Sequence, residues 1–558
     1  MNIHPRYWAT AALFCASAVP AAAEVELSFE ASFAPPMLVN AARAGAAVAI
    51  DDDSILVGAP GDSIRGADAG AVHVWRRTAG VWAFEETIRP LAVQAGDSFG
   101  ASVAVSEGIA LIGAPGDDDV GQNAGLVYVY VHGTTGWSQQ QAFSGSLVNP
   151  GDAFGGSVAM DGDTAVIGAR LDDTYGNNSG AAYVMKRGTS FWGEQSRLLA
   201  PNAAANDQFG TSVDVVGNLA VVSSPAANQN GVNSGAVYVF ERSGNTWGAG
   251  EELPPVGTTW FDSFGQSIAT DGSRIVVGAP GSDAIATDAG GAWSFMQSGG
   301  SWVLEGAFAP QLSGGERLGS SIAISGDTLI VGASGEDYAS SEDGSVHAAE
   351  WGGLAWVAAE RTGNAAGGIS DALGSSLAVD GDLIVVGAPL IDNGVVDSGS
   401  AWLFSTVTEP VGLALCLGDG SGVACPCDNT GNLGEGCANS TGSGARLIAS
   451  GEAVVGADSL QLVVLGARPD RAGIFLQGNV VLGVPFRDGL LCVSEETFRL
   501  EVVVLDANGA GASSILISEG GNCFAGDTRI YQFWYRDPAT SPCGSGSNLS
   551  GAVQVQWQ

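Results

Sequence analysis

One motif recurs along the first four hundred residues and limits what this chain can fold into. In its clearest form, an acid, a variable residue, Phe and Gly are followed further on by Gly-Ala-Pro, as in Asp97–Gly100 and Gly113–Pro115. The anchoring glycines are spaced by 54 or 55 residues and stand at positions 45, 100, 155, 210, 265, 319 and 374. So regular a step predicts one supersecondary unit used seven times.

Each unit contains the signals of four short strands. The apolar runs 157–160 and 164–168 are joined by the turn residues 161–163, which predicts a hairpin. A loop ending in Asn178-Ser179-Gly180 then leads to a third run, 181–184. A fourth run begins at a tryptophan in most copies: Trp82, Trp137, Trp192, Trp247, Trp302 and Trp356. Four strands per repeat make one blade, so the sequence predicts an all-β fold built on a seven-bladed β-propeller.

The two ends of this region predict how the ring is closed. The seventh copy ends with its third strand at 401–404, and no tryptophan-type fourth strand follows. Residues 27–35 align instead with the fourth strand of another copy, 302–310. We therefore expect strand 26–34 to complete blade seven, which removes the open sheet edge of a linear array.

The repeated Phe-Gly and Gly-Ala-Pro elements resemble the FG-GAP repeat of the integrin α-chain β-propeller and its bacterial relatives. The resemblance covers residues 25–406 and implies an extracellular propeller whose loops contact other molecules. Members of this family that bind calcium carry a long Asp-rich loop between the first two strands of a blade. Here that connection is a tight turn, as at 161–163, too short to wrap an ion with six or more oxygens. The family's calcium sites therefore do not carry over, and we expect no metal or other cofactor.

The chain divides into four predicted segments. Residues 1–23 read as a secretory signal peptide, with an arginine, an apolar stretch and a small-residue cleavage site. The propeller follows at 24–406, a Cys-rich linker at 407–443, and a small β-sandwich at 444–558. The sandwich strands are expected at 446–450, 460–465, 473–477, 497–505, 514–518, 528–535 and 552–557.

The cysteines left after processing all lie beyond the propeller, at positions 416, 425, 427, 437, 492, 523 and 543. In an exported protein such a set predicts disulfides that stabilise a small domain. We expect a Cys492–Cys523 bond and local pairs among the first four cysteines, with one thiol left over. A zinc site at Cys425, Cys427 and Cys437 is the alternative, but its ligand spacing is not the usual one.

The charge of the chain excludes some partners. With 59 acidic and 21 basic residues, its formal net charge is −38. Such a surface repels phosphate backbones and anionic lipid, so we expect neither nucleic-acid binding nor membrane insertion after the signal peptide is cleaved. With the signal peptide, the composition predicts a secreted or cell-surface protein.

No catalytic constellation stands out in the sequence. Of the three histidines beyond the signal peptide, His73 and His347 fall on equivalent third-strand positions, which predicts packing, and the third is His132. The acids before Phe-Gly read as turn formers. The phenylalanines of the motif are expected to pack between neighbouring blades: Phe99, Phe154, Phe209 and Phe264. A calcium hypothesis remains for 117–119 and 172–173, against the interpretation of these acids as solvated loop charge.

Two classes of function remain open. We favour a secreted binding or scaffolding protein, not an enzyme, that presents propeller loops to an extracellular protein or polysaccharide. The alternative is an exported propeller enzyme acting on polysaccharide. Such an enzyme would need a carboxylate pair around a pocket, whereas the acids of this chain repeat blade by blade. We therefore name no catalytic, cofactor-binding or metal-binding residue from the sequence.

Overall fold

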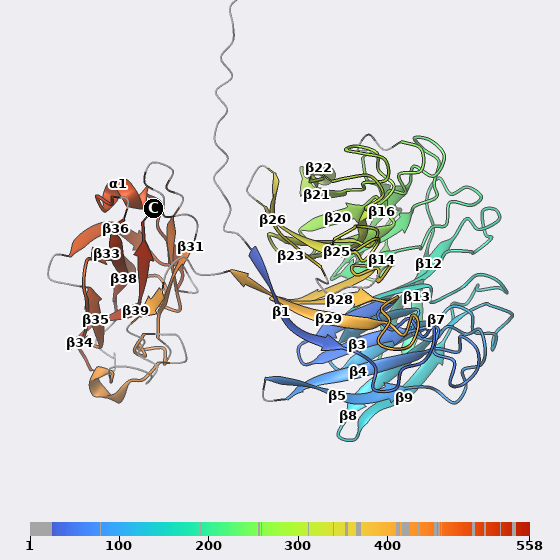
Figure 1. Cartoon of the computed structure of the whole chain (residues 1–558), viewed down its shortest axis with the longest axis horizontal. Coiled ribbons are helices and arrows are strands. Elements are labelled where there is room, and N and C mark those ends of the chain that lie inside the picture. Colours follow the sequence, from blue (N-terminus) through green and yellow to red (C-terminus); the bar gives the residue numbers. More distant parts are fainter. Residues whose placement is uncertain are drawn as a thin grey trace, which may run out of the picture. The chain divides into compact units, whose positions relative to one another are not determined.

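The structure is a computed structural model that describes most of the chain in two compact units, Glu24–Glu409 and Pro410–Gln558 (Figure 1). The described residues are 25–557 except 79, 190, 255–256, 258, 311, 339, 352–354, 364–369, 409–412, 416–423, 432–435, 443, 451–452, 454, 456–457, 459, 494–496, 507–508, 525 and 538–542. The predicted signal peptide, 1–23, lies outside them. No helix in this part of the chain has the length and hydropathy needed to cross a membrane.

The first unit consists of seven antiparallel sheets; six are built from consecutive strands that run outward from an innermost strand, and the seventh takes its outer strand from the start of the unit. Blade one contains β2 (Ala47–Asp51), β3 (Ser54–Ala59), β4 (Ala71–Thr78) and β5 (Val81–Ile88). Blade two contains β6 (Ser102–Ser106), β7 (Ile109–Ala114), β8 (Leu126–Gly133) and β9 (Gly136–Phe143). Blade three contains β10 (Ser157–Asp161), β11 (Thr164–Ala169), β12 (Ala181–Arg187) and β13 (Trp192–Leu198).

The remaining blades repeat this order. Blade four contains β14 (Val213–Val216), β15 (Leu219–Ser224), β16 (Ala236–Ser243) and an outer strand split into β17 (Thr246–Trp247) and β18 (Glu251–Glu252). Blade five contains β19 (Ser267–Thr270), β20 (Arg274–Gly278), β21 (Ala292–Ser298) and β22 (Ser301–Phe308). Blade six contains β23 (Leu318–Ser325), β24 (Thr328–Ala333), β25 (Ser345–Trp351) and β26 (Trp356–Gly363). Blade seven contains β27 (Ser376–Asp380), β28 (Leu383–Ala388), β29 (Ser400–Thr408) and β1 (Val25–Phe33).

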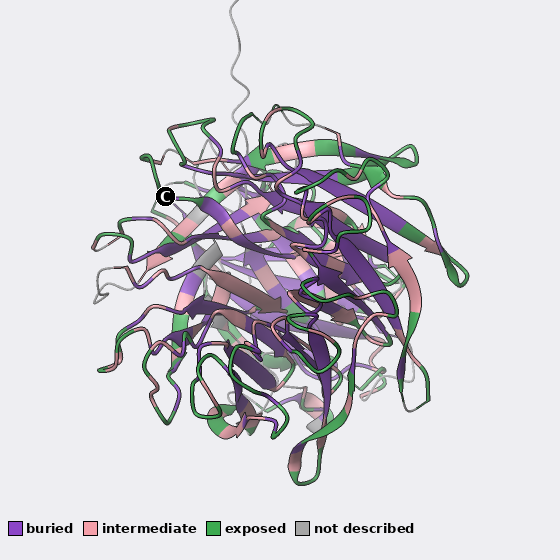
Figure 2. Ribbon diagram, turned by 90° about the vertical axis from the view of Figure 1, so that its right-hand side faces the viewer, coloured by how far each residue is buried: buried purple, intermediate pink, exposed green. Residues whose placement is uncertain are grey.

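These sheets form the predicted seven-bladed β-propeller. The innermost strands contact one another in cyclic order from β2 to β27, and β27 contacts β2. Figure 2 shows that the strands are mostly buried and that the connecting loops are exposed. The predicted hairpin of blade three is also present, since β10 pairs with β11 across the turn at 162–163.

The strand β1 completes blade seven, as the alignment of the chain ends predicts. It pairs antiparallel with β29, from Val25 opposite Thr408 to Phe33 opposite Ala401, and the two strands lie side by side in Figure 1. Leu27 and Phe33 are buried. The backbone N–H of Leu27 also donates to a carboxylate oxygen of Glu360 in blade six. The first strand therefore holds the last blade to its neighbour as well as closing its edge.

Glycine is required where neighbouring blades approach most closely. A Cβ on Gly168, the glycine of a Gly-Ala element, would lie 2.0 Å from the carbonyl oxygen of Gly210 in the next blade. The same carbonyl accepts a hydrogen bond from Ser157 Oγ at 2.9 Å. The contact recurs around the ring with Cβ-to-oxygen distances of 2.0–2.2 Å at Gly58, Gly113, Gly278, Gly332 and Gly387. The two halves of the repeat motif are thus two sides of one contact between blades.

The phenylalanines of the motif pack between blades, as predicted. Phe99 lies in a cluster that joins Leu56 and Val74 of blade one to Ile112 and Tyr128 of blade two. The other three occupy the next three interfaces: Phe154, Phe209 and Phe264. All four side chains are almost completely buried, which identifies them as core residues.

The second unit is also a β-structure. A five-stranded sheet contains β30 (Leu413–Leu415), β39 (Ser547–Gln556), β38 (Thr528–Arg536), β33 (Ala472–Gly478) and β36 (Phe498–Val504). Smaller sheets contain β31 (Arg446–Ser450), β32 (Gln461–Leu465) and β37 (Gly511–Ala512), and the hairpin of β34 (Val481–Phe486) and β35 (Gly489–Val493). A short helix, α1 (Ile517–Gly520), overlaps the strand predicted at 514–518, and the hairpin was not predicted. Strand β30 falls within the predicted linker, yet it pairs with β39 of this unit.

Two disulfides stabilise the second unit, and their pairing differs in part from the prediction. Cys425 bonds to Cys437, one of the expected local pairs, so these two sulfurs do not hold zinc. Cys427 bonds to Cys543, 116 residues away, where a local partner was expected. The predicted Cys492–Cys523 bond is wrong because Cys523 carries a free thiol. These two cysteines belong to different hydrophobic clusters. Cys416 lies outside the described residues.

Candidate binding face of the propeller

The acids before Phe-Gly serve the turns in which they stand. The Asp97 carboxylate accepts a hydrogen bond from the backbone N–H of Gln94 at 2.7 Å, and Asp152 accepts one from Asn149 at the same distance. The equivalent bond is made by Asp207, Asp262 and Glu316. Burial raises the pKa of Asp97 and of Asp152 to about 6. The structure therefore agrees with the predicted turn-forming role, with an acceptor that reaches three residues back.

The acids of the calcium hypothesis are likewise engaged within their own loops. Asp117 accepts from Tyr128 Oη at 2.7 Å and from the N–H of Asp119 at 2.9 Å. Asp118 accepts from the N–H of Asn123 at 2.6 Å. In blade three, Asp172 pairs with Arg197, and Asp173 accepts from the N–H of Asn178. Each of these carboxylates is therefore engaged in its own loop, and the bonds do not direct the carboxylates toward a common ion.

The histidines at the third-strand positions are packing residues, as predicted. His73 is buried, and its Nδ1 lies 2.9 Å from Thr87 Oγ1. Burial, with help from the nearby Arg89, lowers the pKa of His73 to about 4. His347 is also buried, with its Nε2 2.7 Å from a carboxylate oxygen of Glu336. Outside these positions, His132 Nε2 lies 2.9 Å from Glu85 Oε1 on a half-buried part of two neighbouring blades.

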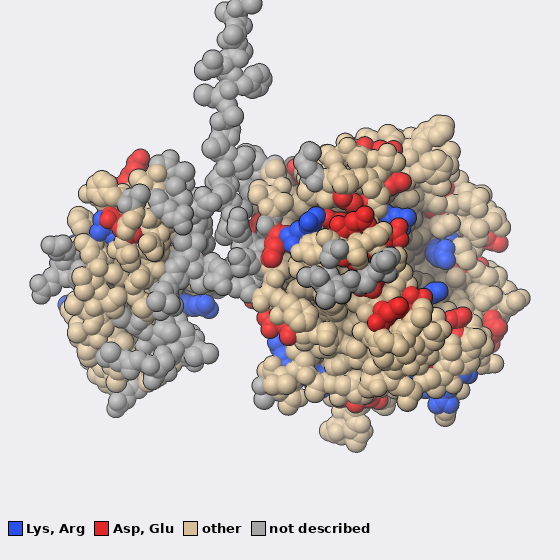
Figure 3. All heavy atoms as spheres, in the orientation of Figure 1, with Lys and Arg blue, Asp and Glu red and all other residues tan. Residues whose placement is uncertain are grey.

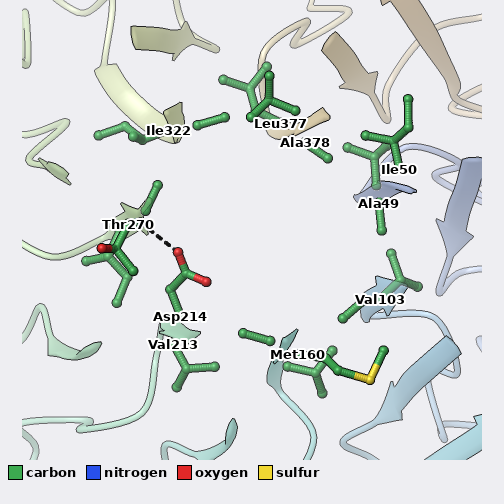
Figure 4. Close-up of a pocket in the computed structure, with 18 of the residues that line it drawn as sticks. Ala49, Ile50, Val103, Met160, Val213, Asp214, Thr270, Ile322, Leu377 and Ala378 are labelled. Carbon is green, nitrogen blue, oxygen red and sulfur yellow. Dashed lines mark hydrogen bonds between the residues drawn. The ribbon is translucent and has the colours of Figure 1, made fainter. Parts of the chain in front are cut away.

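A channel of about 310 Å³ runs between the seven innermost strands (Figure 4). At one position, six blades contribute an alanine: Ala49, Ala104, Ala159, Ala269, Ala323 and Ala378. Blade four places Asp214 there instead, the only charged side chain of this lining. One carboxylate oxygen accepts from the N–H of Thr270 in blade five at 2.7 Å, and the other from Val215 at 2.8 Å. Burial raises the pKa of Asp214 to about 6.

The raised pKa predicts a pH-dependent contribution of Asp214 to stability. The folded protein binds this proton more tightly than the unfolded chain, in which the carboxyl titrates near 3.8. Stability from this group is therefore greatest below pH 4 and is lost as the pH rises to about 6. We therefore compare the Asp214→Asn variant with the native protein at pH 4 and at pH 7. The stability of the variant relative to the native protein should be greater at pH 7 than at pH 4 by about 1–2 kcal/mol. Thermal unfolding at both pH values measures this difference, and a difference that stays constant contradicts the prediction.

A second hollow, of about 270 Å³, lies on the loops of blade six and includes Glu316, Asp337 and Glu342 in its lining. All three stand at repeat positions, whose equivalents in blade two are Asp97, Asp118 and Asn123. Asp337 accepts from the N–H of Glu342 at 2.7 Å, as its equivalents do in other blades. In the described part of the chain, no three His, Cys, Asp or Glu side chains are grouped so that they could hold a metal ion. We therefore interpret these acids as turn residues.

The junction of blades four and five departs from the repeat at several points. Ser223 replaces the Gly-Ala glycine, and its hydroxyl exchanges hydrogen bonds with the backbone of Ser212. Asp214 bridges the same two blades. One face of the propeller carries the loops between the second and third strands of each blade and the connections from one blade to the next, and we call it the loop face. On this face, Trp260 and Phe261 are 66% and 57% exposed. Sequence reasoning missed this aromatic pair, although the comparison of equivalent repeat positions contains the signal.

The surface of the propeller is rich in acids. In Figure 3, aspartate and glutamate atoms cover much more of the visible propeller than lysine and arginine atoms do. This agrees with the net charge of −38. A partner therefore meets a field that repels anions over most of this surface.

Seven four-stranded blades around an axial channel, with glycine contacts between blades and turn carboxylates in the loops, define a repeat-built β-propeller. A family model described as FG-GAP repeat matches six segments of the chain: 82–130, 137–185, 192–240, 248–295, 308–348 and 365–404. The chain belongs to this family of FG-GAP repeat proteins. The first match begins within β5 and ends within β8, so a family unit takes its first strand from the preceding blade. No curated protein matches the chain.

Proposed function

We propose that this chain is a secreted or cell-surface protein that binds an extracellular protein or polysaccharide through its propeller loops. Propellers built from such repeats are commonly used for binding, but the fold alone does not name a partner. The disulfides of the second unit favour an oxidising compartment outside the cytosol. The acidic surface disfavours nucleic acid as the partner.

One observation supports the loop face as the contact surface. The loop between the second and third strands carries an exposed apolar side chain at the same repeat position in blades two, three and five: Val120, Tyr175 and Ile285. The neighbouring acids already accept hydrogen bonds within these loops. Apolar side chains are thus what several loops of this face offer to a partner.

The enzymatic alternative lacks a comparable observation. Glycoside hydrolysis needs two carboxyl groups held on either side of the scissile bond. The acids that line the hollow of blade six stand at repeat positions, and Asp214 makes two backbone hydrogen bonds in the channel. We therefore propose binding without catalysis.

The experiment uses the immobilised full-length protein to capture partners from the native extracellular medium. A variant in which Val120, Tyr175 and Ile285 are replaced by serine should capture the same partner at least tenfold less well. The matched control carries serine at Val81 and Phe191 instead. These two residues are exposed at the hairpins that join the third and fourth strands of their blades. Capture that is equal with both variants, or absent with the native protein, would overturn the proposed function.

A further inference from the structure

We propose that the loop face at the junction of blades four and five holds a site for a neutral glycan, built on Trp260 and Phe261. This inference rests on the proposed binding function and names the class of partner for one part of the same face. The two aromatic residues are adjacent in the sequence, and both side chains are exposed. The equivalent pairs of the six other blades contain no aromatic residue: Asn40–Ala41, Ala95–Gly96, Pro150–Gly151, Ala205–Asn206, Gly314–Gly315 and Ile369–Ser370.

The backbone at this position does not favour a large side chain. Phe261 has φ of 67°, in the left-handed region, where Gly96, Gly151 and Gly315 have φ of 91–94°. Glycine adopts such a conformation without steric cost, whereas a bulky residue is an outlier there. An exposed phenylalanine in this conformation contributes little burial to the fold. A role at the surface accounts better for its presence.

The aromatic pair is held in place by the preceding loop. The Trp260 ring lies directly against Gly231, since a Cβ on that glycine would be 2.1 Å from Trp260 Cδ1. The N–H of Phe261 donates to the carbonyl of Val232 at 2.8 Å, and the exposed Val232 side chain extends the apolar surface. A ligand would therefore meet a largely preformed platform, which lowers the entropic cost of binding.

The loop beside this platform carries no charge. Residues 227–235 contain no acidic or basic side chain. Blade four has Asn228 and blade one has Ser63 where the five other blades have an acid: Asp118, Asp173, Asp283, Asp337 and Asp392. Asn228 Oδ1 accepts from the N–H of Asn233 at 2.9 Å, the bond that the acids make in their loops. The turn is thus kept while the charge is removed, and the exposed residues 228–230 directly precede Gly231, against which Trp260 lies.

An aromatic pair beside an uncharged loop fits a neutral sugar better than an anionic glycan or a basic peptide. Apolar faces of pyranose rings pack on aromatic rings, and amide side chains both donate to and accept from hydroxyl groups. An anionic glycan is repelled by a chain of charge −38. A basic peptide would be attracted to the acidic loops of the other blades rather than to the neutral one. The neutral loop and the aromatic pair together therefore indicate a neutral glycan.

The test is affinity electrophoresis of the full-length protein in gels containing cellulose-derived β-1,4-glucan, xylan, mannan or starch, with alginate as an anionic comparison. We expect at least one neutral polysaccharide to retard the native protein more than alginate does. Trp260→Ala should weaken that retardation about tenfold or more. Phe191→Ala removes an aromatic ring that is equally exposed elsewhere and should leave it unchanged.

A second variant separates binding from folding. Phe261→Gly replaces the ring with the residue that three other blades use, so it should fold with an unchanged or higher melting temperature and still lose affinity for the glycan. No retardation by any neutral polysaccharide, or equal retardation of Trp260→Ala, overturns the glycan site. If the serine variant of Val120, Tyr175 and Ile285 still loses its captured partner, the proposed function survives that failure. If the native protein captures no partner and no glycan, both fall.

Discussion

Gly387→Ala should destabilise the propeller by about 3 kcal/mol, because the added methyl group has no space at the interface between blades seven and one. A Cβ there would lie 2.0 Å from the carbonyl oxygen of Gly45 and 2.2 Å from Ser376 Oγ. Ser376 Oγ also donates to that carbonyl at 2.8 Å, so moving the oxygen away breaks a hydrogen bond. Denaturant unfolding of the propeller transition measures the loss.

The structure offers a matched control for this substitution. Ser223 occupies the equivalent position in blade four and already carries a Cβ, so Ser223→Ala adds no atoms to the interface. It loses only the hydroxyl bonds to Ser212, which predicts a loss of about 1 kcal/mol. Equal losses in the two variants would show that the close approach of the blades is not what the Gly-Ala glycine protects.

Deleting residues 25–33 should cost about 5 kcal/mol, since it removes the burial of Leu27 and Phe33 and the pairing along β29. The exposed edge of β29 should also make the truncated chain self-associate. Melting temperature and light scattering measure the two effects. A synthetic peptide of residues 24–35 should restore the melting temperature of the truncated chain. A truncated chain that melts like the native protein would contradict this account of blade seven.

Most of the propeller could be predicted because its constraints are local and repeated. The Phe-Gly glycine, the Gly-Ala glycine and the turn acids each leave a signal at a fixed spacing. Even the pairing of β1 with β29 was predictable, since 27–35 resembles the outer strand of another blade. A packed interface that recurs around the ring constrains the same few residues every time.

The second unit was less predictable because its constraints are not repeated. The Cys427–Cys543 bond joins residues 116 positions apart, and spacing alone cannot select such a partner. The run at 514–518 has the apolar residues of a strand, but it ends in the turn of helix α1. Such short segments are decided by tertiary packing.

The candidate site was missed for a different reason. Trp260 and Phe261 resemble any exposed loop aromatics until they are set beside Ala95 and Gly96, their counterparts in an earlier repeat. The left-handed backbone of Phe261 and the contact of Trp260 with Gly231 are visible only in three dimensions. A repeat protein is thus best searched for function at the positions where one copy differs from the rest.

The most direct test of the seven-bladed ring is a disulfide between its two ends. Ser28 lies opposite Ser405 across the β1–β29 pair, so Ser28→Cys with Ser405→Cys should form a bond within one chain on mild oxidation. Ser28→Cys with Ser376→Cys is the control, because β27 lies three strands from β1 in the same blade. Peptide mapping of the monomer should find a disulfide between positions 28 and 405 in the first variant and none between positions 28 and 376 in the control. Failure of the first disulfide to form, or its formation only between chains, would contradict the closure of blade seven by the first strand.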